Sequence, residues 1–245
     1  MRRVIRLPLA EDVEDKLNQR QAEADRKRME GALRVNDEWQ TARQSRPLLA
    51  ALATLKQMMG ERERCMYCLD SHGTDIEHFW PKKPYPERMF LWPNLLLCCA
   101  ECGRLKGNRF PLIAGQPMLI DPTAEEPWQY LDFDPTTGNA VARFDLDSDN
   151  WSPKGQGTVE LLQLDRREAL AVGYRRTYRR LAALVERYLN EIGSPADSLV
   201  AALRDADDHG LMGWCFIGTG RNAPPFRDLC ESQPDVWAAC LAACQ

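Results

Sequence analysis

The chain has 245 residues, of which 44% are hydrophobic and 28% charged, and its formal net charge is −4 at pH 7. This length and composition predict a folded, soluble protein with one elaborated domain or two small ones. The sequence contains no run of about 18 apolar residues, which argues against a membrane-spanning helix. The slightly acidic balance argues against a protein that coats nucleic acid non-specifically, so we expect any contact with DNA to be local.

The N-terminal part predicts two helices. From Glu11 to Glu30 the sequence is rich in helix formers but has only a thin apolar stripe, which predicts an exposed helix that is either solvated or docked on a partner. From Ser45 to Gly60, Ser and Pro near the start and Gly at the end bracket PLLAALATLKQMM, whose apolar residues fall on one face. We expect a packed helix there.

The part after Pro111 predicts a hairpin and three helices. Short apolar runs flank the turn signal Pro135–Gly138, which indicates the hairpin. From Asp165 to Asn190 apolar residues recur at helical spacing and arginines gather on the opposite face, which is either solvated or binds phosphate. Further helices are expected over Ser194–Asp207 and Pro225–Cys244, joined by the glycine- and proline-rich connection GWCFIGTGRNAPP.

Nine cysteines raise the question of disulfides or metal. The basic start MRRVIRLPLA runs directly into EDVED without an export signal, so we expect a cytoplasmic location, where reducing conditions favour metal binding over disulfides. Four further cysteines have no C-x-x-C partner and are expected to be buried, inert thiols: Cys215, Cys230, Cys240 and Cys244.

Two C-x-x-C pairs, Cys65 with Cys68 and Cys99 with Cys102, predict a structural Zn²⁺ site. Four thiolates from two such turns supply the tetrahedral set of soft ligands that zinc prefers. Cys98 adjoins the second pair, but Cys99 has the two-residue spacing, so Cys98 is expected in the core. The alternative is four reduced, buried cysteines without metal.

The segment between and after these pairs carries the residues of a known family. DIEHFWP and WPNLLL lie between the pairs, and GRLKGNRFP follows them. The order C-x-x-C, acidic-His, Asn-Leu, C-x-x-C, x-x-x-Lys resembles the zinc-stapled HNH, or His-Me finger, endonucleases. IEHFWPK with WPNLLLCCAEC and KGNRFP is similar to PtuB, the HNH subunit of Septu-type and retron-associated anti-phage systems, and LIDPTAEEPWQYLDF and TVELLQLDRREALAVGYRR also resemble that family.

The resemblance implies an α+β, mostly helical fold. Its centre would be a zinc-stapled ββα (His-Me finger) core, with helical N- and C-terminal elaborations. We expect three parts: a helical segment over residues 1–60, the zinc-bound HNH core over 61–122, and the hairpin with C-terminal helices over 123–245.

The resemblance also assigns roles that suit the chemistry. Phosphodiester hydrolysis needs a base and a cation that neutralises charge on the phosphate. His78 suits the base, and Glu77 offers an oxygen to Mg²⁺ or Mn²⁺. Asn94 would fix the loop or orient the imidazole. His72 is expected in a turn and His209 at a helix end, without catalytic roles.

One position departs from the family. Where the family has Asn or His directly after the last cysteine, as a second ligand for the catalytic cation, this chain has Gly103. Asn108 is a candidate replacement ligand. The alternatives are a site with one protein ligand and more water, or a weakened enzyme.

A basic patch surrounds the expected site, although the chain is acidic. From His78 to Phe110 there are six basic and two acidic residues. Trp80 and Trp92 are expected to brace the core rather than stack on bases. The candidate nucleic-acid contacts are Lys82, Lys83, Arg104, Lys106 and Arg109.

Three functions follow. The first is a metal-dependent HNH endonuclease that cleaves nucleic acid, DNA rather than RNA, as the effector of an anti-phage complex. The second is a zinc-stabilised nucleic-acid-binding or adaptor subunit with a decayed nuclease site. The third is a zinc-ribbon protein that only docks on partners. The resemblance implies a partner ATPase of the SMC or ABC type, of the PtuA kind, and in some systems retron components. No GxxxxGK[ST] motif occurs, so ATP sensing would belong to the partner.

Overall fold

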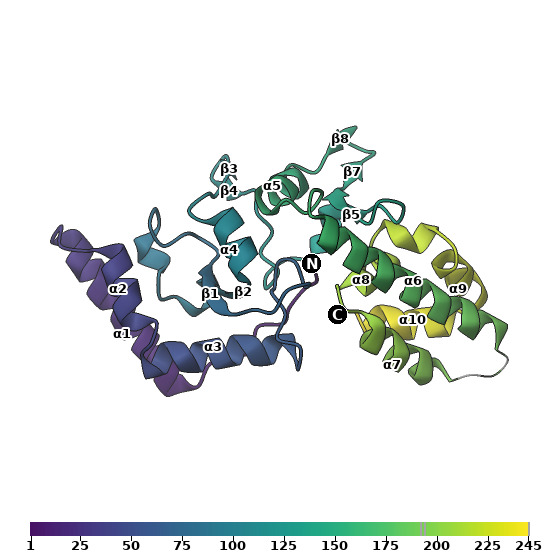
Figure 1. Cartoon of the computed structure of the whole chain (residues 1–245), viewed down its shortest axis with the longest axis horizontal. Coiled ribbons are helices and arrows are strands. Elements are labelled where there is room, and N and C mark those ends of the chain that lie inside the picture. The colour runs from purple at the N-terminus through teal and green to yellow at the C-terminus, as the bar shows by residue number, and fades with distance from the viewer. Residues whose placement is uncertain (192, 194, 245) are drawn as a thin grey trace. The chain divides into compact units, whose positions relative to one another are not determined.

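A computed structural model of the chain, drawn in Figure 1, describes residues 1–191, 193 and 195–244. The chain divides into two compact units. The first unit contains Val4–Tyr67 and Ser71–Gly115, and the second contains Met1–Arg3, Cys68–Asp70 and the chain from Gln116 onward. The division into functional parts at residues 60 and 122 stays a prediction.

The first unit begins with three helices: α1 (Glu11–Met29), α2 (Val35–Ala42) and α3 (Arg46–Met59). The structure agrees with the predicted bounds of α1 and α3 to within one residue, whereas α2 was not predicted. In α3, proline in the first turn suits a helix start, and Gly60 ends the helix with a φ of 74°. Its apolar face is buried, and α3 packs against α1 and the strand β2.

A short antiparallel pair and a helix follow: β1 (Asp75–His78), β2 (Leu95–Cys98) and α4 (Ala100–Lys106). His78 pairs with Leu95 and Asp75 with Cys98. The loop between the strands holds two 3₁₀ turns, η1 (Pro86–Arg88) and η2 (Trp92–Asn94). All four residues of β2 are buried, as expected of the apolar run LLLC, so β2 forms the centre of this unit. Two short strands come next, β3 (Leu112–Ile113) and β4 (Gln116–Pro117).

The second unit contains two small hairpins. Strand β5 (Leu131–Phe133) pairs with β6 (Ala140–Ala142), and the turn between them includes Gly138, which has a φ of 83°. This confirms the hairpin predicted around Pro135–Gly138. The strands β7 (Phe144–Asp145) and β8 (Asn150–Trp151) form the other hairpin.

Six helices complete this unit in the described residues: α5 (Pro153–Leu162), α6 (Glu168–Asn190), α7 (Ala196–Ala206), α8 (Leu211–Phe216), α9 (Phe226–Ser232) and α10 (Pro234–Ala242). Leu170, Tyr174, Leu181 and Val185 form the buried face of α6 that the periodicity predicts. The helix predicted from Ser194 is α7, and Ser194 itself lies outside the described residues. The fold is therefore α+β and mostly helical, with small sheets.

Two predictions for this unit were wrong, and one helix was missed. The single helix expected over Pro225–Cys244 is two helices, because Gln233 leaves the helical conformation before Pro234, which then starts α10. The connection expected over GWCFIGTGRNAPP begins inside α8, whose apolar residues are buried. Helix α5 was not predicted. None of the described helices combines the length and apolar character needed to cross a membrane.

Candidate metal centre and catalytic site

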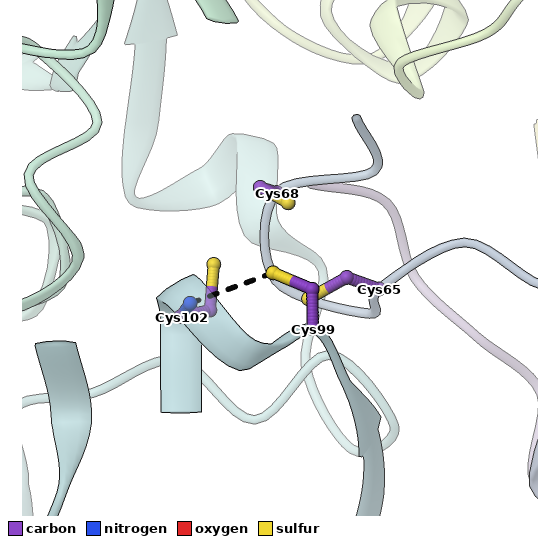
Figure 2. A group of neighbouring side chains, drawn as sticks. All are labelled: Cys65, Cys68, Cys99 and Cys102. Atoms are coloured by element: carbon purple, nitrogen blue, oxygen red, sulfur yellow. Dashed lines mark hydrogen bonds between the residues drawn. The ribbon is translucent and has the colours of Figure 1, made fainter. Parts of the chain in front are cut away.

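The four predicted zinc ligands lie together. The Sγ atoms of Cys65, Cys68, Cys99 and Cys102 are all within 4.8 Å of one another, and all four residues are buried. Tetrahedral Zn²⁺ with Zn–S bonds of about 2.3 Å would place its sulfurs about 3.8 Å apart, so the set fits zinc after a small contraction. In Figure 2 the loop of the first pair faces the N-terminal end of α4, which carries Cys102. These cysteines can therefore hold a zinc ion.

The start of α4 explains why the second pair is in place. Cys99 is the N-cap of α4, and its Sγ accepts a hydrogen bond from the backbone N–H of Cys102 at 3.4 Å (Figure 2). A thiolate at this position satisfies an N–H group that the helix leaves unpaired, and the helix dipole stabilises its charge. The C-x-x-C spacing thus serves the helix cap and the metal at once.

Cys98 lies beside this group without belonging to it. Its Sγ lies 3.9 Å from the Sγ of Cys65, and its thiol donates to the backbone carbonyl of Cys99 at 3.3 Å. Of the four cysteines predicted to be buried near the C-terminus, Cys215 and Cys240 are buried, whereas Cys230 and Cys244 are half-buried, so the prediction was wrong for the last two. Burial raises the pKa of Cys240 to about 11 and that of Cys244 to about 12.

His78 ends β1 and is almost fully buried, with 2% of its surface exposed. Its Nε2 lies 3.0 Å from the backbone oxygen of Met89. Because a carbonyl only accepts, Nε2 carries the proton in this contact and Nδ1 keeps its lone pair. The indole of Trp39, on α2, lies edge-on at 4.4 Å between ring centroids. Burial, with the nearby Lys82 ammonium second, lowers the pKa of His78 to about 3, so the ring is neutral.

Glu77 is joined to a fully buried lysine. Its Oε1 accepts from the Lys106 ammonium at 2.9 Å and from the backbone N–H of His78 at 2.9 Å. The Lys106 ammonium also donates to the backbone carbonyl of His78 at 2.6 Å. The lysine side chain has no exposed surface, whereas 18% of the Glu77 side chain is exposed. The Lys106 ammonium therefore contacts Glu77 and His78 from the protein interior, and the lysine side chain is not exposed to solvent.

Asn94 fixes the loop between β1 and β2. Its Oδ1 accepts from the backbone N–H of Trp80 at 2.7 Å, and its Nδ2 donates to the carbonyls of Trp80 and Arg88 at 3.0 and 2.8 Å. Met89, which follows Arg88, supplies the backbone carbonyl that lies 3.0 Å from Nε2 of His78. Of the two roles foreseen for Asn94, these contacts are those of a residue that fixes the loop.

Gly103 leaves room beside the carboxylate. A Cβ built on Gly103 would lie 3.5 Å from Oε2 of Glu77, which is ordinary contact. Asn108 is exposed in the turn that follows α4. Of the described residues, the four cysteines are the one group of three or more His, Cys, Asp or Glu side chains placed to hold a metal. Glu77 thus offers one carboxylate oxygen, Oε2, that the Lys106 ammonium does not engage.

The remaining predicted residues divide by exposure. Lys83, Arg104 and Arg109 are exposed, and Lys82 is half-buried with its ammonium 5.7 Å from the ring centroid of Trp39. Burial lowers the pKa of Lys82. Exposed positions suit phosphate contacts, which stay a prediction for these residues.

The other two histidines lie elsewhere. His72 is exposed in the turn after the first cysteine pair, with Nε2 3.5 Å from Glu63. His209 is buried, where Nδ1 lies 2.8 Å from Thr177 Oγ1 and Nε2 lies 3.4 Å from Asp70. Thr177 is completely buried, so this arrangement holds α6 and offers no accessible nucleophile.

Sequence reasoning missed the contact between Trp39 and His78. The two residues are far apart in the chain, and the eight-residue helix that carries Trp39 has too few apolar positions to stand out. A tryptophan in an otherwise polar segment was the one available signal, because a large aromatic residue is usually buried against something.

Comparisons with known proteins agree with the resemblance. The chain is similar to the Septu protein PtuB of Bacillus thuringiensis, with 30% identity over 112 residues. That match covers 44% of this chain and 38% of the relative, so the matched region is well under half of the relative's length. No protein-family profile matches the chain.

Proposed function

We propose that this protein is a metal-dependent HNH endonuclease that cleaves phosphodiester bonds of nucleic acid. One observation carries the proposal: β1, which ends in Glu77 and His78, pairs with β2, and α4 follows with two of the four clustered cysteines. This order of two strands and a helix supports a ββα, His-Me finger core. The similarity to a Septu protein PtuB supports the same assignment.

In this proposal His78 accepts the proton of the attacking water. The contact with Met89 keeps the proton on Nε2 and leaves Nδ1 as the acceptor, so the tautomer suits a general base. Asn94 acts as a positioning residue, because it holds the loop that supplies the Met89 carbonyl.

Glu77 is the proposed protein ligand for Mg²⁺ or Mn²⁺, through Oε2, since Oε1 is engaged by Lys106. When bound, such a cation neutralises charge on the phosphate and on the leaving oxygen. Asn108 remains a candidate second ligand. The buried Lys106 ammonium pairs with the Glu77 carboxylate and fixes its orientation, and the zinc that the four cysteines would hold is structural in this proposal.

The cover over His78 sets a condition on this mechanism. A buried imidazole whose pKa is about 3 is a weak base that water does not reach, and Trp39 is the aromatic side chain that lies against it. Catalysis therefore requires α2 to move away from His78. Salt bridges that hold α2 and the residue after it, Lys27 with Glu38 at 2.7 Å and Arg43 with Asp75 at 3.0 Å, are partly or largely exposed and weak enough to open.

We also propose that the nuclease is the effector of an anti-phage defence complex. The similarity to a Septu protein PtuB supports this assignment. As the family resemblance implies, the proposed partner is an ATPase of the SMC or ABC type. DNA is the preferred substrate in this proposal, and retron components are further candidate partners. An ATPase reading frame next to the gene would support the complex; a gene with no such neighbour would count against it.

A cleavage assay tests the nuclease. The protein, alone and with its neighbouring ATPase, is incubated with DNA and RNA substrates, with Mg²⁺, with Mn²⁺ or with EDTA. We expect His78→Ala to reduce the rate by at least about 100-fold, the usual contribution of a general base. The matched control is His72→Ala, since His72 is exposed and has no part in the proposed mechanism. Equal cleavage by wild type and His78→Ala would show that the catalytic assignment is wrong.

A second function is favoured by the same site. His78 lies under Trp39, Lys106 neutralises Glu77, and Gly103 provides no ligand. These features suit a zinc-stabilised nucleic-acid-binding or adaptor subunit whose nuclease site has decayed. That protein would bind nucleic acid or the ATPase but show no metal-dependent cleavage in any combination of the assay above.

A further inference from the structure

Two tryptophans near the site differ in their surroundings. Trp92 is 6% exposed, and its indole N–H donates to the backbone carbonyl of Leu7 at 3.0 Å, so it braces the fold as predicted. Trp80 is only half-buried. It follows His78 by two residues, so the Cα atoms of the two residues are at most about 7.6 Å apart. The prediction that both residues only brace the core therefore describes Trp92 better than Trp80.

Trp80 belongs to a group of half-buried aromatic rings. Its ring centroid lies 4.9 Å from that of Tyr85 and 4.5 Å from that of Phe110, and the last two are 5.9 Å apart. Phe79, which is buried, packs beneath Phe110 at 5.2 Å. We call Trp80, Tyr85 and Phe110 the aromatic platform. A purely structural cluster of this size would hide its rings, whereas all three keep part of their surface in solvent.

The platform is held rigidly. Asn94 bonds to both the N–H and the carbonyl of Trp80, at 2.7 and 3.0 Å. The exposed Arg88 places its guanidinium 4.4 Å from the ring centroid of Trp80. A guanidinium plane stacked on an indole presents its outer face as a further surface on which a base can stack.

Exposed cations lie close to the platform residues in the chain. Lys83, Arg88 and Arg109 are exposed and lie within three residues of a platform ring in the chain. The one acidic residue of the loop, Glu87, is paired with Arg28 at 3.1 Å. Half-exposed aromatic rings among exposed cations are the combination that binds single-stranded nucleic acid, because the rings stack on bases and the cations contact phosphates.

We propose that the aromatic platform, with Arg88, takes an unpaired nucleobase, and that the substrate class of the neighbouring site is single-stranded nucleic acid. The assignment of a substrate to that site rests on the proposed nuclease function. In a duplex both faces of a base are covered by its neighbours, so only an unpaired or unstacked base can lie on these rings. Every base has such a face, and the platform therefore selects strand state and not sequence.

A binding experiment tests the platform without requiring cleavage. The full chain, loaded with zinc and assayed without Mg²⁺, is titrated with labelled oligothymidylate, oligouridylate and a blunt DNA duplex of equal length. We expect both single strands to bind more tightly than the duplex, and Trp80→Ala to weaken single-strand binding by about tenfold or more. Trp80→Phe keeps a ring and should retain most of the affinity. Arg88→Lys should weaken single-strand binding without changing how the affinity depends on salt concentration. Lysine keeps the positive charge but lacks the planar guanidinium on which a base can stack.

The β7–β8 hairpin provides the matched control. Its Phe144 and Trp151 are also exposed and pair at 5.1 Å, but the turn between them carries the acidic residues Asp145, Asp147 and Asp149. Trp151→Ala should leave single-strand binding unchanged. Zinc content and circular dichroism of each variant establish that it is folded, and Tyr85→Ala replaces Trp80→Ala if the latter is not.

Three results would overturn the platform: no binding of any strand, a duplex bound as tightly as single strands, or equal effects of Trp80→Ala and Trp151→Ala. The outcome is independent of the nuclease assay. Single-strand binding that depends on Trp80, without cleavage, would support the platform and contradict the nuclease proposal. Cleavage of duplex that depends on His78 but not on Trp80 would support the nuclease proposal and contradict the platform.

Discussion

Two residues of the cysteine cluster, Cys99 and Cys102, lie in the same β1–β2–α4 segment as the Glu77–His78 pair, yet the two sites differ in completeness. The cluster has four identical ligands that already lie within 4.8 Å of one another, so metal binding needs almost no rearrangement. At the other site the carboxylate is engaged by Lys106 and the imidazole lies under Trp39. The comparison separates a candidate metal centre whose ligands are already gathered from a proposed catalytic centre whose imidazole is covered by Trp39.

The largest effect is expected at the cysteine cluster. Cys102→Ser removes one of four ligands, and structural zinc sites contribute about 10–16 kcal/mol of binding free energy to folding in zinc-finger peptides. We expect the one zinc ion per chain, measured by elemental analysis, to be lost together with cooperative thermal unfolding of the first unit.

Two controls sharpen this prediction. Cys98→Ser tests the choice of Cys99 as the ligand, because Cys98 lies 3.9 Å from Cys65 and should be dispensable for zinc. Cys230→Ser alters a half-buried thiol away from the cluster. Zinc retained in Cys102→Ser but lost in Cys98→Ser would reassign the ligand set.

The next largest effect is expected at Trp39, the side chain that covers His78. Trp39→Ala removes a buried tryptophan, which typically costs about 3–5 kcal/mol of unfolding free energy. It should also expose His78 to diethylpyrocarbonate, so that the rate of modification, followed by mass spectrometry, rises at least tenfold. His72, whose side chain is 56% exposed, labels rapidly in every variant and serves as the internal reference. A His78 that stays protected in folded Trp39→Ala would show that Trp39 is not the cover.

The smallest effect is expected at the carboxylate. Lys106→Met keeps the apolar volume but leaves Glu77 without its cation, and we expect the free energy of unfolding in urea to fall by up to about 3 kcal/mol. This is below the cost for a fully buried pair because Glu77 keeps some contact with water. Glu77→Gln in the same chain should restore part of the loss.

The matched control is Lys56→Met. Lys56 pairs with Glu63 at 2.6 Å, but both side chains are about one-third exposed, and such a pair contributes about 1 kcal/mol or less. Similar losses in the two lysine variants would mean that burial of Lys106 has no special consequence for Glu77.

The parts of this molecule that sequence predicts well are those fixed by local spacing. C-x-x-C brings two sulfurs to one turn, and the bracketed apolar face of α3 defines a helix, whatever the rest of the chain does. The cover on His78 and the burial of Lys106 depend on contacts between distant segments. Lys106 and Glu77 are 29 residues apart, and no local pattern distinguishes a lysine that turns inward from one that faces solvent.

The same limit explains the errors in the aromatic residues and helices. Trp80 and Trp92 look alike in sequence, because each follows an apolar or aromatic residue and precedes proline. Trp92 differs in that its indole N–H donates to the backbone carbonyl of Leu7, a residue 85 positions away in the chain. The break at Gln233 before Pro234 was readable in principle, since proline restricts the residue before it, but the apolar residues on both sides favoured one continuous helix.

Gly103 has a consequence for engineering. A Cβ there would meet Oε2 of Glu77 at 3.5 Å and Sγ of Cys98 at 3.9 Å, so the backbone tolerates a side chain at this position. What the position lacks is a donor atom, not space. Asparagine is also a slightly better helix former than glycine. The single substitution Gly103→Asn would therefore place an amide oxygen near the carboxylate, so the proposed dependence on a cation could be adjusted by design.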